Sequence, residues 1–396
     1  MATSGVPLSR LSHLQCSRCD REHPAGVVQQ RCGCGGALLA RYRLEDLSLD
    51  ALRARPAGAW RYRELLPVQG DPVSLGEPET PLLFLGRLSE EWGVETWMKD
   101  DGPLPGGTFK ARGACVGLSR AVELGITRVV MPTAGNAGGT WSLYAARAGI
   151  GITVVMAEST PPANQAEVRV AGGELVLVPG SIADAGRRAA EIAGATGAFL
   201  ATTFSEPYRL EGKKSAWLEL FDRMGETRAS PGAPPMAFPR TIVLPVGGGV
   251  AAVAAAKAAA EVAALGWAAG NPPRLVGIQA AACAPIVRAY EAGDHEALPW
   301  EDDPRTIAAG LRVPAPAEGA MVLECVRATG GAMHAVAEDE IRGAMVRLAS
   351  TEGVFACPEG ATTVAAMDRL ARAGLEGPVV LYNTGAGAKY VDVLHG

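Results

Sequence analysis

The sequence lacks the features of a nucleic-acid-binding protein. Its 396 residues hold 37 lysines and arginines against 42 aspartates and glutamates, and only 5% of the residues are Phe, Trp or Tyr. Neither sign of charge forms a long run, and no basic stretch alternates with aromatic residues, so nothing in the sequence is suited to a phosphate backbone. With 48% apolar residues the chain can bury a large core. We therefore expect a soluble, folded protein whose partners are small molecules.

Long apolar runs are missing as well. Residues 1–12 show no basic start followed by an apolar stretch, and the alanine-rich run 250–265 is interrupted by Lys257 and Glu261. We expect neither a signal peptide nor a membrane span. Four of the eight cysteines lie close together near the N-terminus, and the other four are scattered singly, namely Cys115, Cys283, Cys325 and Cys357. This pattern is typical of a reducing cytoplasm rather than of a disulfide framework.

The clustered cysteines form two short motifs, Cys16-Ser-Arg-Cys19 and Cys32-Gly-Cys34. Glycine turns allow four such sulfurs to converge on one ion, so the motifs predict a structural zinc ribbon. The Cys-x-Cys spacing of the second motif is less usual than Cys-x-x-Cys, and a loop of reduced, metal-free thiols is the alternative. His13 and His23 are alternative ligands. A closed four-sulfur site stabilises its segment without taking part in catalysis.

From about residue 95 onward, short β-branched runs alternate with alanine-rich stretches of helical spacing. Strands are expected at 128–131, 152–156, 175–178, 241–245, 275–279 and 379–383, and helices at 137–148, 182–195, 251–265, 338–351 and 361–373. Such alternation predicts parallel βαβ units, and hence an α/β protein with one or two doubly wound sheets. The proline-rich stretch 229–239 is expected to be a surface connection.

Glycine-rich loops follow three of these strands and a lysine precedes them. Lys110 comes after a Gly-Gly-Thr turn, where burial beside another basic group such as Arg112 would activate its amine as a nucleophile. The loop 132–140 leads from a strand into a helix and carries Asn136, so that backbone N–H groups can bind an anion such as a substrate carboxylate. Read singly, the first feature is a solvated helix-start lysine and the second a plain turn.

The other two loops complete the pattern. Val246-Gly-Gly-Gly249 is a cradle without side chains that suits a phosphate, and Thr384 follows the last strand with a hydroxyl that can meet a pyridine nitrogen. Each loop lies at the carboxyl end of an expected strand, where open α/β sheets gather their ligands. The four features in this order predict a pyridoxal-phosphate (PLP) enzyme, in which the Asn136 amide holds the ring oxygen of the cofactor.

This order of motifs resembles the tryptophan-synthase-β-like (fold type II) PLP enzymes from Glu77 to the C-terminus. Within them it is most similar to the threonine synthases, through the strings Glu206-Pro-Tyr-Arg-Leu-Glu-Gly-Lys-Lys214 and Glu352-Gly-Val-Phe-Ala-Cys-Pro-Glu-Gly-Ala361. The resemblance implies that Lys110 is the catalytic, cofactor-bearing residue. It implies further cofactor contacts at Asn136, Val246, Gly247, Gly248, Gly249, Val250 and Thr384, and substrate contacts at Thr133, Gly135, Asn136, Ala137 and Arg209.

The resemblance also implies an architecture. We expect a zinc-ribbon-like segment at 1–45, a large PLP-binding α/β domain formed by 46–112 and 205–396, and a small α/β domain at 113–204, with the cofactor between the two α/β domains. A homodimer is the family expectation.

The implied reaction is the conversion of O-phosphohomoserine and water to threonine and phosphate, with Arg209 binding the substrate phosphate. Ala111, the Gly247-Gly-Gly249 run and Thr133-Ala134 depart from the threonine synthase pattern, and the first two are closer to the serine/threonine dehydratases. An ammonia-lyase acting on threonine or serine is therefore an alternative, as is β-replacement on phosphoserine, the reaction of cysteate synthases. A PLP- or zinc-dependent binding or regulatory protein with a vestigial pocket is the non-enzymatic alternative.

Overall fold

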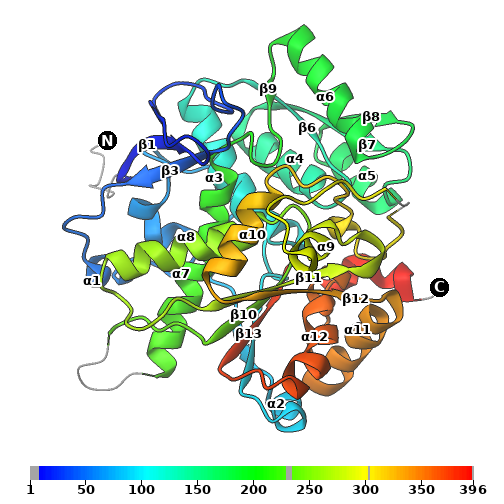
Figure 1. Cartoon of the computed structure of the whole chain (residues 1–396). Coiled ribbons are helices and arrows are strands. Elements are labelled where there is room, and N and C mark those ends of the chain that lie inside the picture. Colours follow the sequence, from blue (N-terminus) through cyan, green and yellow to red (C-terminus); the bar gives the residue numbers. More distant parts are fainter. Residues whose placement is uncertain (1–8, 229–233, 302–303, 395–396) are drawn as a thin grey trace. The chain divides into compact units, whose positions relative to one another are not determined.

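A computed structural model describes residues 9–228, 234–301 and 304–394, and divides the chain into two compact units (Figure 1). The first unit comprises Met1–Pro78 and Lys110–Ser215, and the second comprises Glu79–Phe109 and Ala216–Gly396. These units are defined by contacts and do not test the three-part division expected from the sequence, which stays a prediction. The first half of the expected connection 229–239 lies outside the described residues.

The first unit begins with a small antiparallel sheet of order β2-β1-β3, formed by β1 (Leu11–Cys16), β2 (Glu22–His23) and β3 (Leu38–Tyr42). The short helices α1 (Leu49–Arg53) and η1 (Ala59–Leu65) follow. The cysteine motifs lie at one end of this sheet, since Cys16 is the last residue of β1.

A parallel sheet of order β8-β7-β6-β9 forms the rest of the first unit. Its strands are β6 (Arg128–Pro132), β7 (Gly151–Ala157), β8 (Glu174–Val178) and β9 (Phe199–Leu200), and its helices are α3 (Lys110–Glu123), α4 (Ala137–Ala148), α5 (Pro162–Val170) and α6 (Ile182–Thr196). Successive strand residues face opposite sides. Val155 accordingly packs against Ala185 and Ala189 of α6, whereas Val154 and Met156 touch Gly138 of α4, so helices cover both faces of the sheet.

The second unit contains a six-stranded sheet of order β12-β11-β10-β13-β5-β4. Its strands are β4 (Leu82–Phe84), β5 (Thr96–Asp100), β10 (Thr241–Pro245), β11 (Arg274–Ala280), β12 (Ala332–Val336) and β13 (Val379–Asn383). Only β4 runs antiparallel to its neighbour. Its helices are α2 (Gly86–Trp92), α8 (Val250–Ala264), α9 (Pro285–Ala292), α10 (Gly319–Ala328), α11 (Glu338–Glu352) and α12 (Pro358–Arg372), with short turns η2 (Pro105–Gly107), η3 (Ala281–Cys283), η4 (Ala309–Leu311) and η5 (Gly387–Leu394). Helix α7 (Arg209–Thr227) begins in the first unit and ends in the second.

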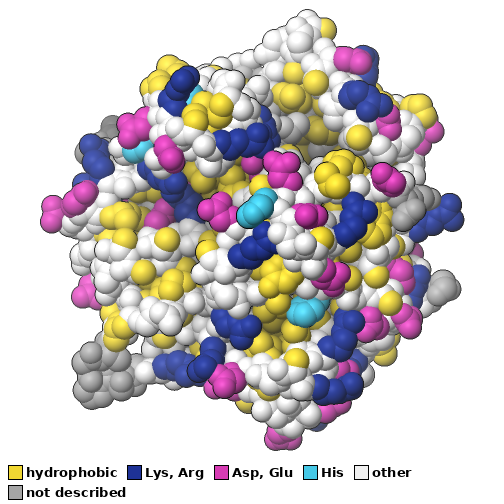
Figure 2. Space-filling model, viewed as in Figure 1, with side chains coloured by type: hydrophobic (Ala, Val, Ile, Leu, Met, Phe, Trp, Pro, Cys, Tyr) yellow, Lys and Arg dark blue, Asp and Glu magenta, His cyan; other side chains and the backbone are white. Residues whose placement is uncertain are grey.

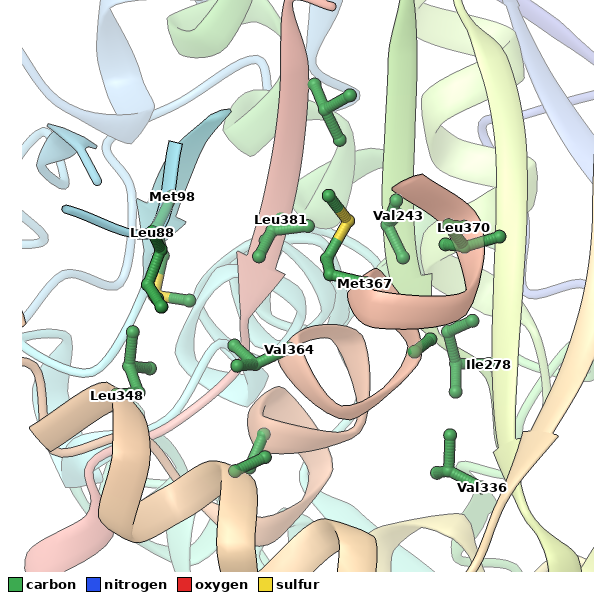
Figure 3. Packing of buried hydrophobic residues seen from close by; sticks show 14 of the residues in the cluster. Leu88, Met98, Val243, Ile278, Val336, Leu348, Val364, Met367, Leu370 and Leu381 are labelled. Atoms are coloured by element: carbon green, nitrogen blue, oxygen red, sulfur yellow. The ribbon is translucent and has the colours of Figure 1, made fainter. Parts of the chain in front are cut away.

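One face of this sheet carries a large apolar core (Figure 3). Val243, Ile278 and Leu381 project from three neighbouring strands onto α12, which contributes Val364 and Met367. All five side chains are at most 1% exposed, so this packing holds the carboxyl ends of the strands, where the loops of interest emerge, in a fixed arrangement.

The surface of the protein carries both signs of charge (Figure 2). In the view of Figure 2, basic and acidic side chains are interspersed rather than gathered by sign. Among the described residues, no helix has both the length and the apolar character needed to cross a bilayer.

Candidate active site

Lys110 is the first residue of α3 and is half-buried. The turn before it needs glycine, because Gly106 and Gly107 have φ of 74° and 65°. The two residues that precede the lysine are anchored to the Thr384 carbonyl oxygen, which accepts from Phe109 N at 2.9 Å and from Thr108 Oγ1 at 3.1 Å. Lys110 therefore follows directly on a segment whose backbone is fixed against the loop after β13.

Helices α3 and α7 touch at their first turns within the first unit. A Cβ atom on Gly113 would lie 3.0 Å from the Arg209 carbonyl oxygen, and one on Gly212 would overlap the carbonyl oxygen of Arg112. Such an approach requires residues without side chains. Because Lys110 begins α3 and Arg209 begins α7, this contact brings the amino ends of both helices, with their partial positive charge, to one place.

Arg209 is 7% exposed and is held in a defined orientation. Its Nε donates to Glu206 Oε2 at 3.1 Å, its Nη2 donates to Ala201 O at 2.8 Å, and the guanidinium stacks over the Trp141 ring at 4.5 Å. These bonds use two of the five N–H groups of an arginine. Arg209 is thus a buried residue at the start of a helix that can still bind an anion.

Lys213 is a site residue that the sequence reasoning missed. It lies one helical turn after Arg209 on α7 and is 6% exposed. Burial lowers its pKa well below the ordinary lysine value, the positive charges of Lys110 and Arg209 lower it further, and only Glu206 opposes them. Lys110, Arg209 and the Glu206 carboxylate therefore all act on the charge of Lys213, and an anionic ligand would stabilise its charged form.

Arg112 does not take the part suggested for it beside Lys110. Its side chain is fully buried and donates from Nη1 to Ser215 Oγ at 2.8 Å. Lys213 is instead the basic residue whose pKa the charge of Lys110 lowers. Arg112 therefore links α3 to α7.

The loop between β6 and α4 presents Asn136 in a fixed orientation. Asn136 Oδ1 accepts from Asn164 Nδ2 at 2.9 Å, which turns the amide N–H groups of Asn136 away from that partner. The hydroxyl of Thr133 bonds within the loop, accepting from Gly135 N at 3.2 Å. Ala137 is the first residue of α4. Gly135 N and Gly138 N donate within the turn, and the amino end of the helix as a whole favours an anion.

The glycine loop after β10 is shaped for a phosphate. Gly249 has φ of 81°, and a Cβ atom there would overlap a methyl group of Val322. A Cβ on Gly247 would lie 2.7 Å from the Gly310 carbonyl oxygen. Val246 and Val250 flank the run, and Val250 begins α8. The loop is therefore a backbone cradle at a helix amino end, which fits the phosphate of PLP.

Gln279 supports this cradle and is a second site residue that the sequence reasoning did not identify. It is fully buried at the end of β11. Its Nε2 donates to Val246 O at 3.1 Å, and its Oε1 accepts from the backbone N–H groups of Ile286 and Val287 at 2.9 and 3.0 Å. A single glutamine thus ties the start of the cradle to the start of α9.

The loop after β13 is held from two sides. Thr108 pairs with Gly385 and Ala356 pairs with Ala386 in isolated bridges. Thr384, which directly precedes these two bridged residues, is 5% exposed, and its Oγ1 lies 3.4 Å from Cys357 Sγ. A hydroxyl in a fixed position is suited to a hydrogen bond with a cofactor atom that must also be fixed, such as a pyridine nitrogen.

The four N-terminal thiols form a metal-like cluster. All four sulfurs lie within 4.8 Å of one another, and the group consists of Cys16, Cys19, Cys32 and Cys34. Burial raises the pKa of Cys16, but backbone N–H groups and neighbouring thiols outweigh it and lower that pKa to about 6. A backbone N–H favours the Cys19 thiolate, but the other sulfurs raise its pKa to about 12.

Four sulfurs at this spacing cannot all ionise without a cation, which fits a zinc site. A Cβ on Gly36 would lie 2.5 Å from Cys16 Sγ, so this glycine lets the second motif approach the first. Within the part of the chain that the structure describes, His13 and His23 do not belong to the group.

Comparisons with known proteins agree with this geometry. The family model described as "Pyridoxal-phosphate dependent enzyme" matches residues 73–385. The threonine synthase of Methanosarcina acetivorans is 32% identical over 381 residues, which cover 94% of this chain and 91% of the relative. That of Methanocaldococcus jannaschii is 30% identical over 391 residues, covering 96% and 93%.

Among solved structures, a threonine deaminase from T.th. matches with a TM-score of 0.65 and 26% identity, covering 86% of this chain and 98% of that one. The expected fold class and the resemblance to threonine synthases are thereby confirmed. The chain belongs to the fold type II family of pyridoxal-phosphate-dependent enzymes and is threonine-synthase-like in sequence.

Proposed function

We propose that this protein is a threonine synthase, which converts O-phosphohomoserine and water to threonine and phosphate. The similarity to threonine synthases over more than nine-tenths of the chain supports the proposal. The observation that carries it is the group of Lys110, Arg209 and Lys213, of which Arg209 and Lys213 are buried. A substrate without a phosphate has no use for so much buried positive charge, whereas a phosphorylated substrate compensates it.

The binding roles follow from the contacts above. The Gly247 to Gly249 cradle, with Val246 and Val250, holds the cofactor phosphate, Asn136 donates to the ring oxygen, and Thr384 bonds to the ring nitrogen. The substrate carboxylate binds the backbone at the start of α4, through Thr133, Gly135, Asn136 and Ala137. Arg209 and Lys213 bind the substrate phosphate as charged hydrogen-bond donors.

Lys110 performs the proton transfers. When bound, the cofactor supplies an electron sink for the charge that develops on the substrate carbon. The Lys110 amine then removes the proton from Cα and afterwards a proton from Cβ, so that phosphate can leave from Cγ. Protons are returned to Cγ and Cα, and water adds its hydroxyl at Cβ, which gives threonine. Arg209 and Lys213 stabilise the departing phosphate by bonding to its oxygens. Lys110→Ala should abolish turnover.

An ammonia-lyase acting on threonine or serine is the second candidate. It is favoured by Ala111 and the Gly247-Gly-Gly249 run, and by the similarity to a threonine deaminase. This reaction needs removal of the Cα proton and loss of the β-hydroxyl, and its substrate has no phosphate for Arg209 and Lys213 to bind. Replacement at Cβ of phosphoserine would use the same charges and is tested by the same experiment.

Product analysis of the PLP-loaded protein distinguishes these reactions. The protein is incubated separately with O-phosphohomoserine, phosphoserine with a nucleophile, threonine and serine, and products are identified by mass spectrometry. We expect threonine and phosphate from the first substrate, and loss of this product in Arg209→Ala. An oxo acid from threonine or serine, with no threonine from phosphohomoserine, would establish the ammonia-lyase instead. Undiminished turnover of phosphohomoserine by Arg209→Ala would refute the role of Arg209.

We also propose that the four clustered thiols hold one zinc ion, that the protein works in the cytoplasm, and that it is a homodimer. The sulfur geometry supports the first. The scattered free cysteines support the second, and the family resemblance supports the third. Analytical ultracentrifugation of the purified protein checks the dimer.

A further inference from the structure

A chain of side-chain contacts in the second unit leads from Asp100 to Thr384. Asp100 and Asn383 face each other where β5 and β13 end, and Asn383 Nδ2 donates to Asp100 Oδ1 at 2.7 Å. Cys357 Sγ lies 3.6 Å from Asn383 Oδ1 and 3.4 Å from Thr384 Oγ1. Cys357, Asn383 and Thr384 are at most 5% exposed, so water does not compete for these contacts.

The contacts of Asn383 determine which way its amide group is oriented. The Asn383 amide cannot turn round, because its oxygen would then face the Asp100 carboxylate and its NH₂ would face the N–H of Gly385, which donates to Oδ1 at 3.4 Å. Asn383 Oδ1 is therefore an acceptor where it meets Cys357. The thiol has one proton, and its possible acceptors are Asn383 Oδ1, Thr384 Oγ1 and the Glu359 side chain.

Two further contacts keep the thiol in this role. Gly360 N donates to Cys357 Sγ at 3.3 Å, and Cys357 N donates to Gly385 O at 3.0 Å, which fixes both the sulfur and its backbone. Burial and the nearby Glu359 carboxylate raise the pKa of Cys357, so the thiol stays protonated. The protonated thiol and the Thr384 hydroxyl can therefore form one hydrogen bond in which either group is the donor.

We propose that Cys357 is a positioning residue that makes the Thr384 hydroxyl a hydrogen-bond donor toward the cofactor. This rests on the proposed role of Thr384 beside the pyridine nitrogen and adds the groups that control it. A donor hydroxyl pairs with a ring nitrogen that carries no proton, because a protonated nitrogen would need an acceptor. When the Thr384 hydroxyl gives its proton to the ring nitrogen, its oxygen accepts the proton of the Cys357 thiol, whereas without a ligand the hydroxyl can donate to the sulfur instead.

A double-mutant cycle on cofactor affinity tests this inference. PLP is titrated into wild type, Cys357→Ala, Cys357→Ser, Thr384→Val and the Cys357→Ala/Thr384→Val double variant, with the dissociation constant and the absorption maximum of the bound cofactor as readouts. We expect Cys357→Ala to bind PLP about fivefold more weakly, as for a lost hydrogen bond, with a shifted absorption maximum. Cys357→Ser, which keeps a donor and an acceptor, should stay within about twofold of wild type.

The decisive comparison is in the Thr384→Val background. If Cys357 acts through Thr384, Cys357→Ala should add nothing there, and an equal loss in both backgrounds would show a merely structural role. Cys325→Ala, a half-buried thiol on α10 of the same unit, should leave affinity and spectrum unchanged. Should Cys357→Ala fail to fold, Cys357→Val fills the volume of the thiol and also removes the donor.

The readouts use no amino-acid substrate. A wild-type protein that binds PLP but makes no threonine refutes the proposed function while the cycle still reports on Cys357. Threonine formation together with unaltered cofactor affinity and spectrum in Cys357→Ala refutes only this inference. Failure of wild type to bind PLP refutes both.

Discussion

Two buried basic residues on the first turns of α7, Arg209 and Lys213, contribute differently to the binding of an anion. Arg209 is oriented by Glu206, by the Ala201 carbonyl and by the Trp141 ring. Lys213 has a flexible stem and an ammonium whose charged form is disfavoured by burial and by its cationic neighbours. The oriented arginine sets the position of a bound anion. The charged form of the lysine is stabilised when the anion binds beside it.

Replacing Lys213 with glutamine should therefore weaken substrate binding selectively. Lys213→Gln keeps a polar side chain but removes one charged hydrogen bond to the substrate phosphate, and we expect the KM for O-phosphohomoserine to rise about tenfold or more. The dissociation constant for PLP should change by less than about twofold. Steady-state kinetics and a cofactor titration measure the two quantities. Lys257→Gln on α8, where the native lysine pairs with Glu261, is the matched control, and a KM unchanged in Lys213→Gln would contradict the assignment.

The depressed pKa of Lys213 also predicts a pH dependence. Lys213 binds a dianion only when protonated, and in the free protein burial, Lys110 and Arg209 lower its pKa below 10.5. Between about pH 8, where phosphate is already dianionic, and 10.5, inorganic phosphate should therefore bind the PLP-loaded protein more weakly as pH rises. Bound phosphate should raise the pKa of Lys213, so binding takes up protons. Calorimetry in two buffers of different ionisation enthalpy measures both effects, and Lys213→Met should lose most of the proton uptake.

At the scale of elements, the close contact between α3 and α7 sets where these charges lie. The contact depends on Gly212, since a Cβ atom there would overlap the carbonyl oxygen of Arg112. Gly212→Ala should push the helices apart and destabilise the protein by about 1–3 kcal/mol, as overpacking does. Thermal unfolding followed by circular dichroism measures the change.

Gly186 in α6 provides the matched control in the same unit. No atom lies within 4 Å of a Cβ built on it, so Gly186→Ala should stabilise the protein by about 0.5–1 kcal/mol through helix propensity. Equal effects of the two substitutions would show that the contact at Gly212 is not tight.

The sequence was sufficient for elements whose signal is local. The alternating apolar runs predicted the strand at 241–245 and the helix at 137–148, which the structure shows with the same limits. Helix α12 begins at Pro358 rather than at residue 361, because proline suits the first helical position and Cys357 caps it. Strand β12 was missed, since Ala332–Val336 is short and has no strongly β-branched pattern.

The residues of the candidate site also differ in whether the sequence alone identifies them. Lys110, Asn136 and the 246–250 loop were recognisable because each lies in a motif with its own spacing. Lys213 and Cys357 were not, because their importance comes from partners distant in the sequence, such as Lys110 and Asn383. The residue pattern of one segment does not show which distant segment will pack against it.

At the scale of the whole molecule, the family match and the metal-like cluster occupy different parts of the chain. The match covers residues 73–385, whereas the cysteine cluster lies at 16–34. The small sheet that carries the cluster is attached to the rest of the first unit by side-chain contacts, including Tyr42 Oη to Glu211 Oε2 at 2.9 Å. Since Glu211 lies on α7 between Arg209 and Lys213, the cysteine-rich segment also braces the helix that carries the substrate-binding charges.

Removal of the proposed zinc should therefore affect stability first and substrate binding second. We expect one zinc per chain by elemental analysis, and loss of the metal in a Cys16→Ser/Cys32→Ser variant, because zinc retention needs the thiolates. Metal loss should lower the temperature of unfolding and raise the KM for O-phosphohomoserine a fewfold, while PLP affinity stays within about twofold because the Gly247 to Gly249 cradle belongs to the other unit. Cys115→Ser, a buried thiol of the same unit outside the cluster, controls for loss of a cysteine and should retain zinc. A purified protein that lacks zinc yet unfolds at the same temperature after zinc is supplied would show that the cluster is a set of reduced thiols.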